Sequence, residues 1–404
     1  MKSGGPLRIG MLTNSVYSRD ARVRRYSEFL AEEGHQVDII CLDSENSLPQ
    51  SSSPHVSVYC VPMTRVRAEG AGLVKNWFSL FAHMFFLFSK LQIKRRYDLV
   101  HVHNMPDFLV FCALISRVRG CPIVLNVHDP VPELARSKLA LPTDSVLVRV
   151  LSFLESISIG FSSHVITPTR TFRDALVSRG IPDEKITIIT NAADSRFFSP
   201  NGDEPDSAKR NSGFTLLYVG TVAARYGLDV VIRALPGLRD SIPGLKFRIV
   251  PKIRQEGVAL DRCLALADEL GVRDLLQVDD PLPLEKMAGI MRQADIGVYP
   301  ARVDCHMDIA LSLKIPEMAM IGLPIIATRL TILEELFGND SIAFVPPEDP
   351  AAFASKVLEL YRSPELRQKL ARKAAAKSET LAWENHCEIY RNLLEGLLQR
   401  PLHG

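Results

Sequence analysis

A lysine and a glutamate three residues apart, Lys314 and Glu317, form a polar pair with a specific chemical use. Residues at this spacing lie on one face of a helix. The carboxylate can accept hydrogen bonds from two vicinal hydroxyls, as on a ribose, and the lysine can meet a phosphate. The residues that follow predict a glycine–proline turn at 322–324 and then a buried strand.

A second candidate site follows the apolar strand 214–220, which ends at Gly220. The turn 221–227 leads into a helix that starts near Leu228, and backbone N–H groups at a helix start hold anions well. Arg225 would add a positive charge beside them. Neither half of the chain has a G-x-G-x-x-G sequence after its first strand, which argues against a dinucleotide-binding dehydrogenase. The sequence also contains no Walker A, G-x-S-x-G or H-E-x-x-H motif.

Polar residues also follow two predicted strands of the first half, 99–103 and 123–128. A histidine directly after a buried strand, followed by an acid and two prolines, is typical of a rigid loop that holds the imidazole at a cleft edge. In the alternative interpretation, these acids and prolines only shape turns and cap the next helix. For His101 and His103, which lie within a strand, a structural role is favoured. The candidates at the strand ends are Asn104, Asp107, His128, Asp129 and Glu133.

The elements that must position these residues alternate between strand and helix. Strand 7–14, a helix ending at Gly34 and strand 37–42 form a βαβ unit, which predicts a parallel sheet. A polar, proline-containing stretch at 199–212 is the best linker candidate, and a second alternation begins at Phe214. Within the first half we predict further strands at 56–61, 164–167 and 186–190 and helices at 106–119 and 147–161. In the second half we predict helices at 228–238, 259–270, 284–292 and 315–321 and strands at 246–250, 276–278, 296–299, 324–328 and 342–345.

Composition limits the class of protein. At 404 residues the chain is long enough for two domains, and 47% hydrophobic residues indicate a globular protein. A net charge of +2 argues against a nucleic-acid binder. Seven cysteines without regular spacing argue against a disulfide framework or a zinc site and fit a reducing cytoplasm. Because the N-terminus has no long apolar region, we expect no secretion.

The segment 73–91 is unusually apolar and aromatic, and basic residues flank it. Lys75, Asn76 and His83 interrupt it, so it is too short for a membrane span. Two interpretations stay open: a helix that packs into the core, and a helix that lies on an anionic membrane surface with its aromatic side chains inserted.

The stretch 314–328 reads K-x-x-E-M-A-x-x-G-x-P-I-I-A-T and resembles the nucleotide-sugar signature of retaining GT-B glycosyltransferases of family four. The resemblance covers nearly the whole chain. Further matching pieces are D-x-R-V at 20–23, G-H-x-V at 34–37, H-N-x-P-D at 103–107, H-D-x-x-P-E at 128–133, N-A-x-D at 191–194 with FFSP at 197–200, and Y-V-G-x-x-x-x-R-Y-G-L-D at 218–229. The last piece resembles the phosphate loop of a branch that acts in bacterial polysaccharide assembly.

The resemblance implies an α/β GT-B fold, with two Rossmann-like doubly wound domains facing each other across a cleft. Residues 1–200 would bind the acceptor and residues 201–383 the nucleotide sugar, while a C-terminal helix at about 384–404 would pack back on the first domain. The substrates implied are a nucleotide sugar, UDP- or GDP-linked, and a lipid-linked or glycan acceptor in cell-surface polysaccharide synthesis. The family needs no metal and no further cofactor. We therefore expect a cytoplasmic enzyme with a peripheral membrane contact through about 73–96.

The family's roles carry over to individual residues of this sequence. Glu317 would bind the ribose, Lys314 and Arg225 would neutralise the diphosphate, and His128 would face the donor sugar and the reacting centre. The catalytic set implied is His128, Glu317 and Lys314. The donor-binding set is Gly220, Arg225, Lys252, Lys314, Glu317, Pro324 and Ile325. The acceptor-binding set is Asp20, Arg22, Asn104, Asp107, Asp129 and Glu133.

The sequence departs from the family's pattern at three places. Ile309 stands where a second glutamate is usual, with Asp304, His306 and Asp308 nearby as possible sugar contacts. Tyr226 replaces the usual lysine of the phosphate loop, which makes Arg225 the substitute. Pro251 and Lys252 replace a glycine-rich turn, although Lys252 is placed to reach a phosphate. Two alternatives therefore stay open: a catalytically inactive homologue that serves as a nucleotide-binding scaffold, and a sugar-nucleotide epimerase.

Overall fold

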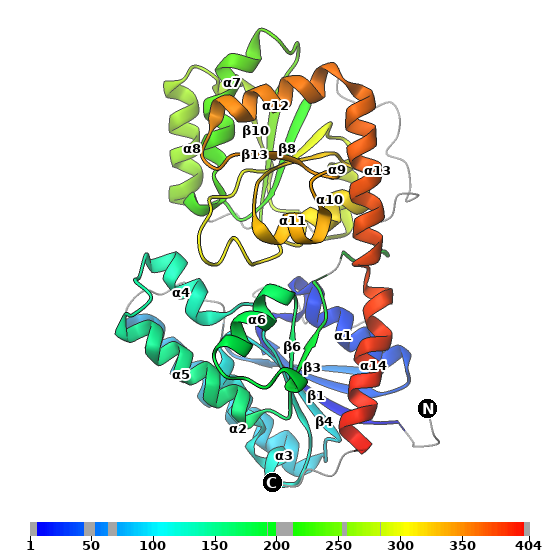
Figure 1. Cartoon of the computed structure of the whole chain (residues 1–404). Coiled ribbons are helices and arrows are strands. Elements are labelled where there is room, and N and C mark those ends of the chain that lie inside the picture. The colour runs from blue at the N-terminus through cyan, green and yellow to red at the C-terminus, as the bar shows by residue number, and fades with distance from the viewer. Residues whose placement is uncertain are drawn as a thin grey trace. The chain divides into compact units, whose positions relative to one another are not determined.

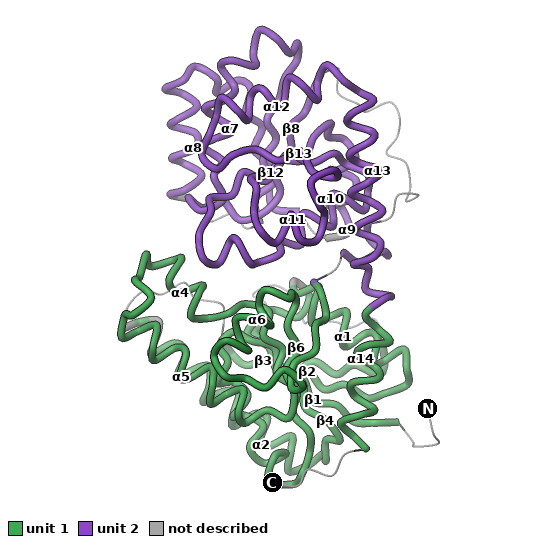
Figure 2. The backbone as a smooth tube through the Cα atoms, in the orientation of Figure 1, with its two compact units in different colours: residues 1–190, 386–404 green, residues 191–385 purple. Residues whose placement is uncertain are grey.

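The computed structural model describes residues 6–43, 53–63, 71–191, 193–198, 213–252, 257–282 and 284–399. The chain divides into two compact units (Figure 2): unit 1 is 1–190 with 386–404, and unit 2 is 191–385. The linker expected at 199–212 lies outside the described residues. The boundary falls ten residues before the expected position because Ala193 and Phe198 are buried in the core of unit 2.

Unit 1 is built on a seven-stranded parallel sheet with the order β3-β2-β1-β4-β5-β6-β7 (Figure 1). Its strands are β1 (Arg8–Val16), β2 (Gln36–Leu42), β3 (Val56–Val61), β4 (Leu99–His103), β5 (Ile123–Asn126), β6 (His164–Thr167) and β7 (Ile186–Ile188). Its helices are α1 (Ala21–Glu32), α2 (Ala71–Lys94), α3 (Leu114–Val118), α4 (Val131–Leu139), α5 (Val146–Phe161), α6 (Arg170–Ser178) and most of α14 (Trp383–Gln399), with 3₁₀ turns η1 (Tyr17–Arg19), η2 (Asp107–Ala113) and η3 (Asp183–Lys185).

The two faces of the unit 1 sheet have different surroundings. Along β4, Val100 and Val102 belong to the apolar core that also holds Met84 and Phe88 of α2. The alternate residue His101 is on the opposite face, where its ring contacts Tyr26 of α1 and Tyr390 of α14. The helix expected at 106–119 is instead a 3₁₀ turn, η2, followed by the short helix α3.

Unit 2 contains a six-stranded parallel sheet with the order β10-β9-β8-β11-β12-β13. Its strands are β8 (Thr215–Gly220), β9 (Lys246–Pro251), β10 (Leu276–Val278), β11 (Ile296–Tyr299), β12 (Ile325–Thr328) and β13 (Ala343–Val345). Its helices are α7 (Leu228–Arg239), α8 (Gly257–Glu269), α9 (Leu284–Arg292), α10 (Lys314–Met320), α11 (Thr331–Phe337), α12 (Pro350–Arg362) and α13 (Pro364–Thr380), with 3₁₀ turns η5 (Ala224–Tyr226) and η6 (Arg273–Leu275). Each unit is thus a parallel α/β fold, as the alternation predicted.

In the described part of the chain, no helix is both long and apolar enough to cross a membrane. The helix α2 has 24 residues, among them Lys75, Lys90 and Lys94. Its inward side packs into the core of unit 1 through Leu80, Met84, Phe88 and Leu91, in agreement with the first of the two interpretations of this segment.

Candidate active site

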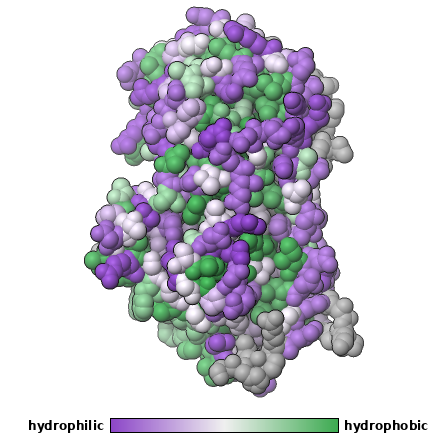
Figure 3. Space-filling model, viewed as in Figure 1, coloured by the Kyte–Doolittle hydropathy of each residue, from purple (hydrophilic) through white to green (hydrophobic). Residues whose placement is uncertain are grey.

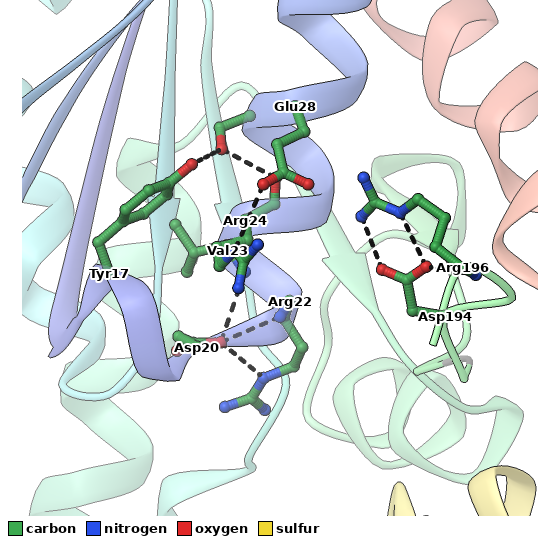
Figure 4. Close-up of polar contacts among 9 residues, drawn as sticks. Tyr17, Asp20, Arg22, Val23, Arg24, Glu28, Asp194 and Arg196 are labelled. Atoms are coloured by element: carbon green, nitrogen blue, oxygen red, sulfur yellow. Dashed lines mark hydrogen bonds and ion pairs between the residues drawn. The ribbon is translucent and has the colours of Figure 1, made fainter. Parts of the chain in front are cut away.

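Asp20 caps the N-terminus of α1 (Figure 4). Its Oδ1 accepts hydrogen bonds from the backbone N–H groups of Arg22 (3.2 Å) and Val23 (3.4 Å), and the Arg22 Nε lies 3.5 Å from the same oxygen. Burial on its own would raise the pKa of Asp20, but the charge of Arg22 together with smaller contributions from His128 and Ser15 brings it well below its usual range. The structure therefore brings the predicted acceptor residues Asp20 and Arg22 together as an ionised pair.

Asn104 joins the loops that follow β4 and β5. Its Nδ2 donates to Asp107 Oδ1 (2.9 Å) and to the carbonyl of Asp129 (2.7 Å). Its Oδ1 accepts from the backbone N–H groups of His128 (3.1 Å) and Asp129 (3.3 Å). The buried amide thus uses both its donor and its acceptor side to fix the loop that carries His128.

Two acidic residues predicted to border the acceptor are held by other side chains. Burial raises the pKa of Asp107 to about 6, despite its hydrogen bond from Asn104. Glu133, in the first turn of α4, pairs with Arg179 at 2.5 Å, and the same guanidinium lies 2.8 Å from Glu155 of α5. Burial raises the pKa of Glu155 to about 8. Sequence analysis missed Arg179, which lies just before the glycine that ends α6.

His128 lies at the carboxyl end of β5 as an uncharged ring. Burial, together with the positive charge of Arg22, lowers its pKa to about 3. Its Nδ1 is buried without a hydrogen-bond partner in the described structure. A neutral imidazole with an unpaired nitrogen can exchange a hydrogen bond with an uncharged sugar hydroxyl, which is the contact that the role predicted for His128 requires.

His101 and His103 stack on each other with ring centroids 4.2 Å apart, and the His103 and His128 centroids are 6.4 Å apart. His101 Nδ1 lies 2.8 Å from the hydroxyl oxygen of Tyr390. Burial lowers the pKa of His103 to about 3, with a further contribution from His128. This row of neutral rings forms the packing layer behind His128, in line with the structural role favoured for the first two.

In unit 2, the predicted phosphate loop joins β8 to α7. The chain leaves β8 at Gly220, forms η5 and turns at Gly227, whose φ is +65°. A Cβ atom at Gly227 would lie 1.9 Å from the carbonyl oxygen of Pro300, so only glycine fits there. Lys252, exposed at the end of β9, donates its backbone N–H to the carbonyl of Gly220 over 3.0 Å. The predicted donor residues Gly220, Arg225 and Lys252 therefore share one edge of the sheet.

The Arg225 side chain is directed by the loop after β11. Its Nη2 contacts His306 Nδ1 at 3.0 Å and Asp304 Oδ2 at 3.6 Å. Asp304 Oδ1 in turn accepts the backbone N–H groups of His306 and Met307, both at 2.8 Å. Tyr226, in the position of the usual lysine, is partly buried and packs its ring near Tyr299 and against the core of the unit.

Arg302 fastens this phosphate loop and was missed by the sequence analysis. Its backbone N–H donates to the carbonyl of Arg225 (2.9 Å), and its Nη1 donates to the carbonyl of Ala224 (2.5 Å). Its guanidinium is held by Asp229 (2.9 Å) and Glu348 (2.7 Å). The sequence signal that could have identified Arg302 was its position three residues after β11, the strand that neighbours β8 in the sheet.

Lys314 and Glu317 lie one turn apart on α10, as predicted. The Lys314 Nζ donates to Glu317 Oε2 over 2.6 Å, and the glutamate side chain is buried while the lysine is partly exposed. The predicted pair Pro324 and Ile325 is buried at the turn into β12, where the carbonyl of Pro324 accepts the N–H of Gly297 over 2.9 Å.

The neighbours of Ile309 have separate tasks. Asp308 accepts the N–H and the hydroxyl of Thr331, both at 2.8 Å, and so holds the start of α11. Asp304 and His306 both contact Arg225 as described.

Asp194, from the predicted interdomain motif, binds the Arg196 guanidinium through two hydrogen bonds (Figure 4), with distances of 2.9 and 2.6 Å. Within the described residues, no group of three or more His, Cys, Asp or Glu side chains is arranged to hold a metal ion.

Comparison with known protein families covers most of the chain. Residues 20–192 match the glycosyl transferase 4-like domain, and residues 213–363 match glycosyl transferases group 1. The D-inositol 3-phosphate glycosyltransferase 1 of Catenulispora acidiphila is 25% identical over 388 residues, which are 92% of this chain and 90% of that protein. The D-inositol 3-phosphate glycosyltransferase of Nocardiopsis dassonvillei is 27% identical over 396 residues, with coverages of 90% and 86%.

Solved structures agree on the fold. Sucrose-phosphate synthase from Thermosynechococcus elongatus has a TM-score of 0.77 at 18% identity, covering 96% of this chain and 100% of that one. Anabaena HepE in complex with UDP and glucose has a TM-score of 0.73 at 15% identity, with the same coverages. The two parallel-sheet units thus define the fold class as GT-B. The chain belongs to the GT-B glycosyltransferases of the family-four type, and it is a transferase enzyme.

Proposed function

We propose that this enzyme transfers a hexose-type sugar, with retention of configuration, from a UDP- or GDP-sugar to a lipid-linked or glycan acceptor in cell-surface polysaccharide synthesis. The observation that supports the donor part is the Lys314–Glu317 pair in the same unit as the Arg225 phosphate loop. One group presents a carboxylate to vicinal hydroxyls, and the other two present positive charge to a diphosphate. The complex of HepE with UDP and glucose gives the uridine donor the greater support.

The proposed catalysis is electrostatic and requires no metal or further cofactor. Lys314 and Arg225 stabilise the charge that develops on the departing diphosphate, which is the form of catalysis that preorganised charges provide best. His128, neutral at physiological pH because its pKa is about 3, orients the donor sugar without adding charge near the oxocarbenium-like centre. Glu317 fixes the nucleotide, so its contribution is to binding and alignment.

The acceptor part of the proposal concerns unit 1. The proposed acceptor-binding residues occur at the ends of β1, β4 and β5 and at the starts of α1 and α4. They are Asp20, Arg22, Asn104, Asp107, Asp129 and Glu133. In open parallel sheets ligands bind at the carboxyl ends of strands, which favours these residues as the acceptor border. A lipid-linked acceptor requires contact with a membrane, and the segment 73–96 with its aromatic and basic residues is proposed to supply it at the cytoplasmic face.

The test is a thermal-shift screen of the purified protein against UDP-, GDP-, ADP- and dTDP-sugars. A ligand that binds only the folded protein raises its melting temperature with concentration. We expect a shift with one donor and its loss in Glu317→Ala. The matched control is Glu359→Ala, because Lys356 and Glu359 form an ion pair of the same spacing and distance, 2.6 Å, on the surface of α12.

The outcomes separate the proposed enzyme from an inactive scaffold. A donor-dependent shift accompanied by sugar transfer to lipid extracts supports the proposal. A shift without donor hydrolysis or transfer favours the scaffold, to which Ile309 and Tyr226 point. Conversion of the donor sugar without any acceptor favours an epimerase. Absence of a shift with every nucleotide contradicts the donor assignment itself.

A further inference from the structure

The outward side of α2 is apolar although it faces solvent. Phe78 and Phe86 are 75% and 72% exposed, and Ile93 is 66% exposed. These positions are eight and seven residues apart, so they form one stripe on the helix, opposite the core-facing Leu80 and Met84. The core of unit 1 therefore accounts for only one side of α2, and the other side has no packing partner in the described structure.

A second helix of unit 1 has the same property, which the sequence did not reveal. On α5, Val146 (76%) and Phe153 (63%) are exposed, with Leu147 and Val150 exposed between them. The opposite side of the helix is buried through Val148, Leu151 and Ile159. The short helix α3 adds Leu114 and Val118, of which the second is 79% exposed.

These three helices cover the same face of the unit 1 sheet. Both α2 and α5 pack against η2: Trp77 and Phe81 contact the ring of Phe108, and Phe161 contacts the ring of Phe111. The turn η2 continues directly into α3. Hydrophobic surface is visible along the lower left edge of Figure 3, where Figure 1 draws α5 and α2. We call the exposed side of α2, α3 and α5 the outer helical face.

The charged residues of the outer helical face are of one sign. On α2 the exposed charges are Lys75, Lys90 and Lys94, and that helix contains no acidic residue. On α5 the exposed charge is Arg149. The single acid of α5, Glu155, is buried and pairs with Arg179. The exposed Asp144 lies in the turn before α5 and off these helices.

The outer helical face is continuous with the predicted acceptor loop. The helix α4 begins at Val131, two residues after Asp129, and ends at the exposed Leu139. It packs along α5, so the segment that leaves the His128 loop leads to the apolar side chains of α5. Exposed patches of this extent indicate an interaction surface, and apolar side chains among basic ones match an anionic lipid surface.

We infer that the outer helical face lies on an anionic phospholipid surface, with Phe78, Phe86 and Phe153 inserted among the acyl chains and the lysines at the headgroups. That this surface also brings the enzyme to a lipid-linked acceptor rests on the proposed function. The contact of the outer helical face with lipid does not depend on the proposed function. The contact extends beyond the aromatic segment 73–96, because α5 contributes as much exposed apolar side chain as α2.

The experiment is co-sedimentation of the full chain with vesicles of phosphatidylglycerol and phosphatidylcholine, and with phosphatidylcholine alone, at 50 and 500 mM salt. We expect binding to the anionic vesicles at low salt and at least tenfold weaker binding for Phe86→Glu and for Phe153→Glu. The matched control is Val258→Glu, an equally drastic change at a 69% exposed position on α8 of unit 2, which should bind like the wild type. Circular dichroism and the melting temperature verify that all three variants fold.

Each outcome has a separate meaning. Loss of binding in Phe86→Glu alone overturns the inference, because it restricts the contact to α2. Salt-insensitive binding to both vesicle types overturns the anionic preference. Dimers that dissociate in Phe153→Glu, without vesicle binding, assign the face to a second copy of the chain. The donor screen is run on the same variants: retained vesicle binding without any donor shift contradicts the proposed function, whereas a donor shift without vesicle binding contradicts the lipid surface.

Discussion

The ammonium group of Lys314 donates a hydrogen bond to the carboxylate of Glu317 over 2.6 Å, within the first turn of α10. The two groups were expected to contact different parts of a nucleotide. In the structure they form an ion pair, which keeps the buried carboxylate of Glu317 paired. In the proposed function, a nucleotide has to compete with this internal ion pair for both groups, so its contacts with Lys314 and with Glu317 depend on each other.

The first prediction concerns Lys314→Met. Loss of a charge-assisted hydrogen bond to phosphate corresponds to about 2 kcal/mol, so we expect the affinity for the nucleoside diphosphate to fall roughly tenfold to hundredfold. The affinity for the nucleoside without phosphates should change much less, because the nucleoside has no phosphate for Lys314 to contact. Isothermal calorimetry with the diphosphate and the nucleoside checks this difference. Equal losses for both ligands would show that Lys314 acts only by holding Glu317.

The second prediction concerns Arg302, which binds two carbonyls of the phosphate loop. In Arg302→Ala the loop loses its guanidinium anchor, so we expect the donor KM to rise about tenfold with a smaller change in kcat and in the acceptor KM. The matched control is Arg329→Ala, which removes an exposed arginine of the same unit that pairs with Glu334. Steady-state kinetics with both substrates varied decide the outcome. A uniform fall in kcat with unchanged KM values would contradict the positioning role.

The third prediction concerns Gly227→Ala. The new Cβ would lie 1.9 Å from the carbonyl oxygen of Pro300, at a φ of +65° that alanine disfavours. We expect the free energy of unfolding of unit 2 to fall by at least about 2 kcal/mol, with loss of donor binding. In Gly237→Ala, within α7 and with nothing within 4 Å of the new Cβ, we expect a gain of up to about 1 kcal/mol. Urea unfolding of both variants in a Trp77→Phe background, followed by the fluorescence of Trp383, provides the comparison.

The fourth prediction is a pH dependence of unit 1. Burial lowers the pKa of His103 and of His128 to about 3, whereas histidine in an unfolded chain titrates near 6.5. The unfolded chain therefore takes up protons below pH 6.5 that the folded chain does not. The corresponding stability is present above pH 6.5 and is lost as the pH falls toward 3.

The variant His103→Gln tests this dependence. Between pH 7 and pH 5 the wild type should lose about 2 kcal/mol more of its free energy of unfolding than the variant. The reason is that the unfolded wild type binds a proton at His103, whereas the unfolded variant has no imidazole there. The two tryptophans of the sequence fall in different units, Trp77 in unit 1 and Trp383 in unit 2. Urea unfolding in a Trp383→Phe background therefore reports unit 1 alone through Trp77. Parallel stability curves for the two proteins would refute the prediction.

The fold and the types of site residue were largely accessible from the sequence. Alternating strands and helices with apolar runs determine a parallel α/β fold, and the spacing of Lys314 and Glu317 places both on one helical face. The 3₁₀ turn η2 was read as helix, because apolar periodicity cannot separate a tight turn over the core from an α-helix. The contacts of Arg302 and Arg179 could not be predicted, since each depends on segments that are distant in sequence.

The same limit applies to the exposed side of α5. Its sequence, VLVRVLSFLESISIGF, reads as a buried helix, and hydropathy alone does not indicate how much of such a helix its neighbours cover. Only the positions of η2 and α4 show that Val146, Val150 and Phe153 remain in solvent. In the segment 73–96, several basic residues accompany the apolar ones, and this combination is what predicted a membrane contact. In α5 only one exposed arginine accompanies the apolar residues, so the same signal is missing from its sequence.

Unit 1 contains both ends of the described chain, and this determines when it can be completed during synthesis. Tyr390 of α14 is fully buried against Tyr26, and its hydroxyl lies 2.8 Å from His101 Nδ1. Unit 2 is one continuous stretch, 191–385, and all of it precedes Tyr390 on the ribosome. Unit 2 can therefore fold while the chain is still being made, whereas unit 1 is completed only when α14 emerges and packs against Tyr26 and His101.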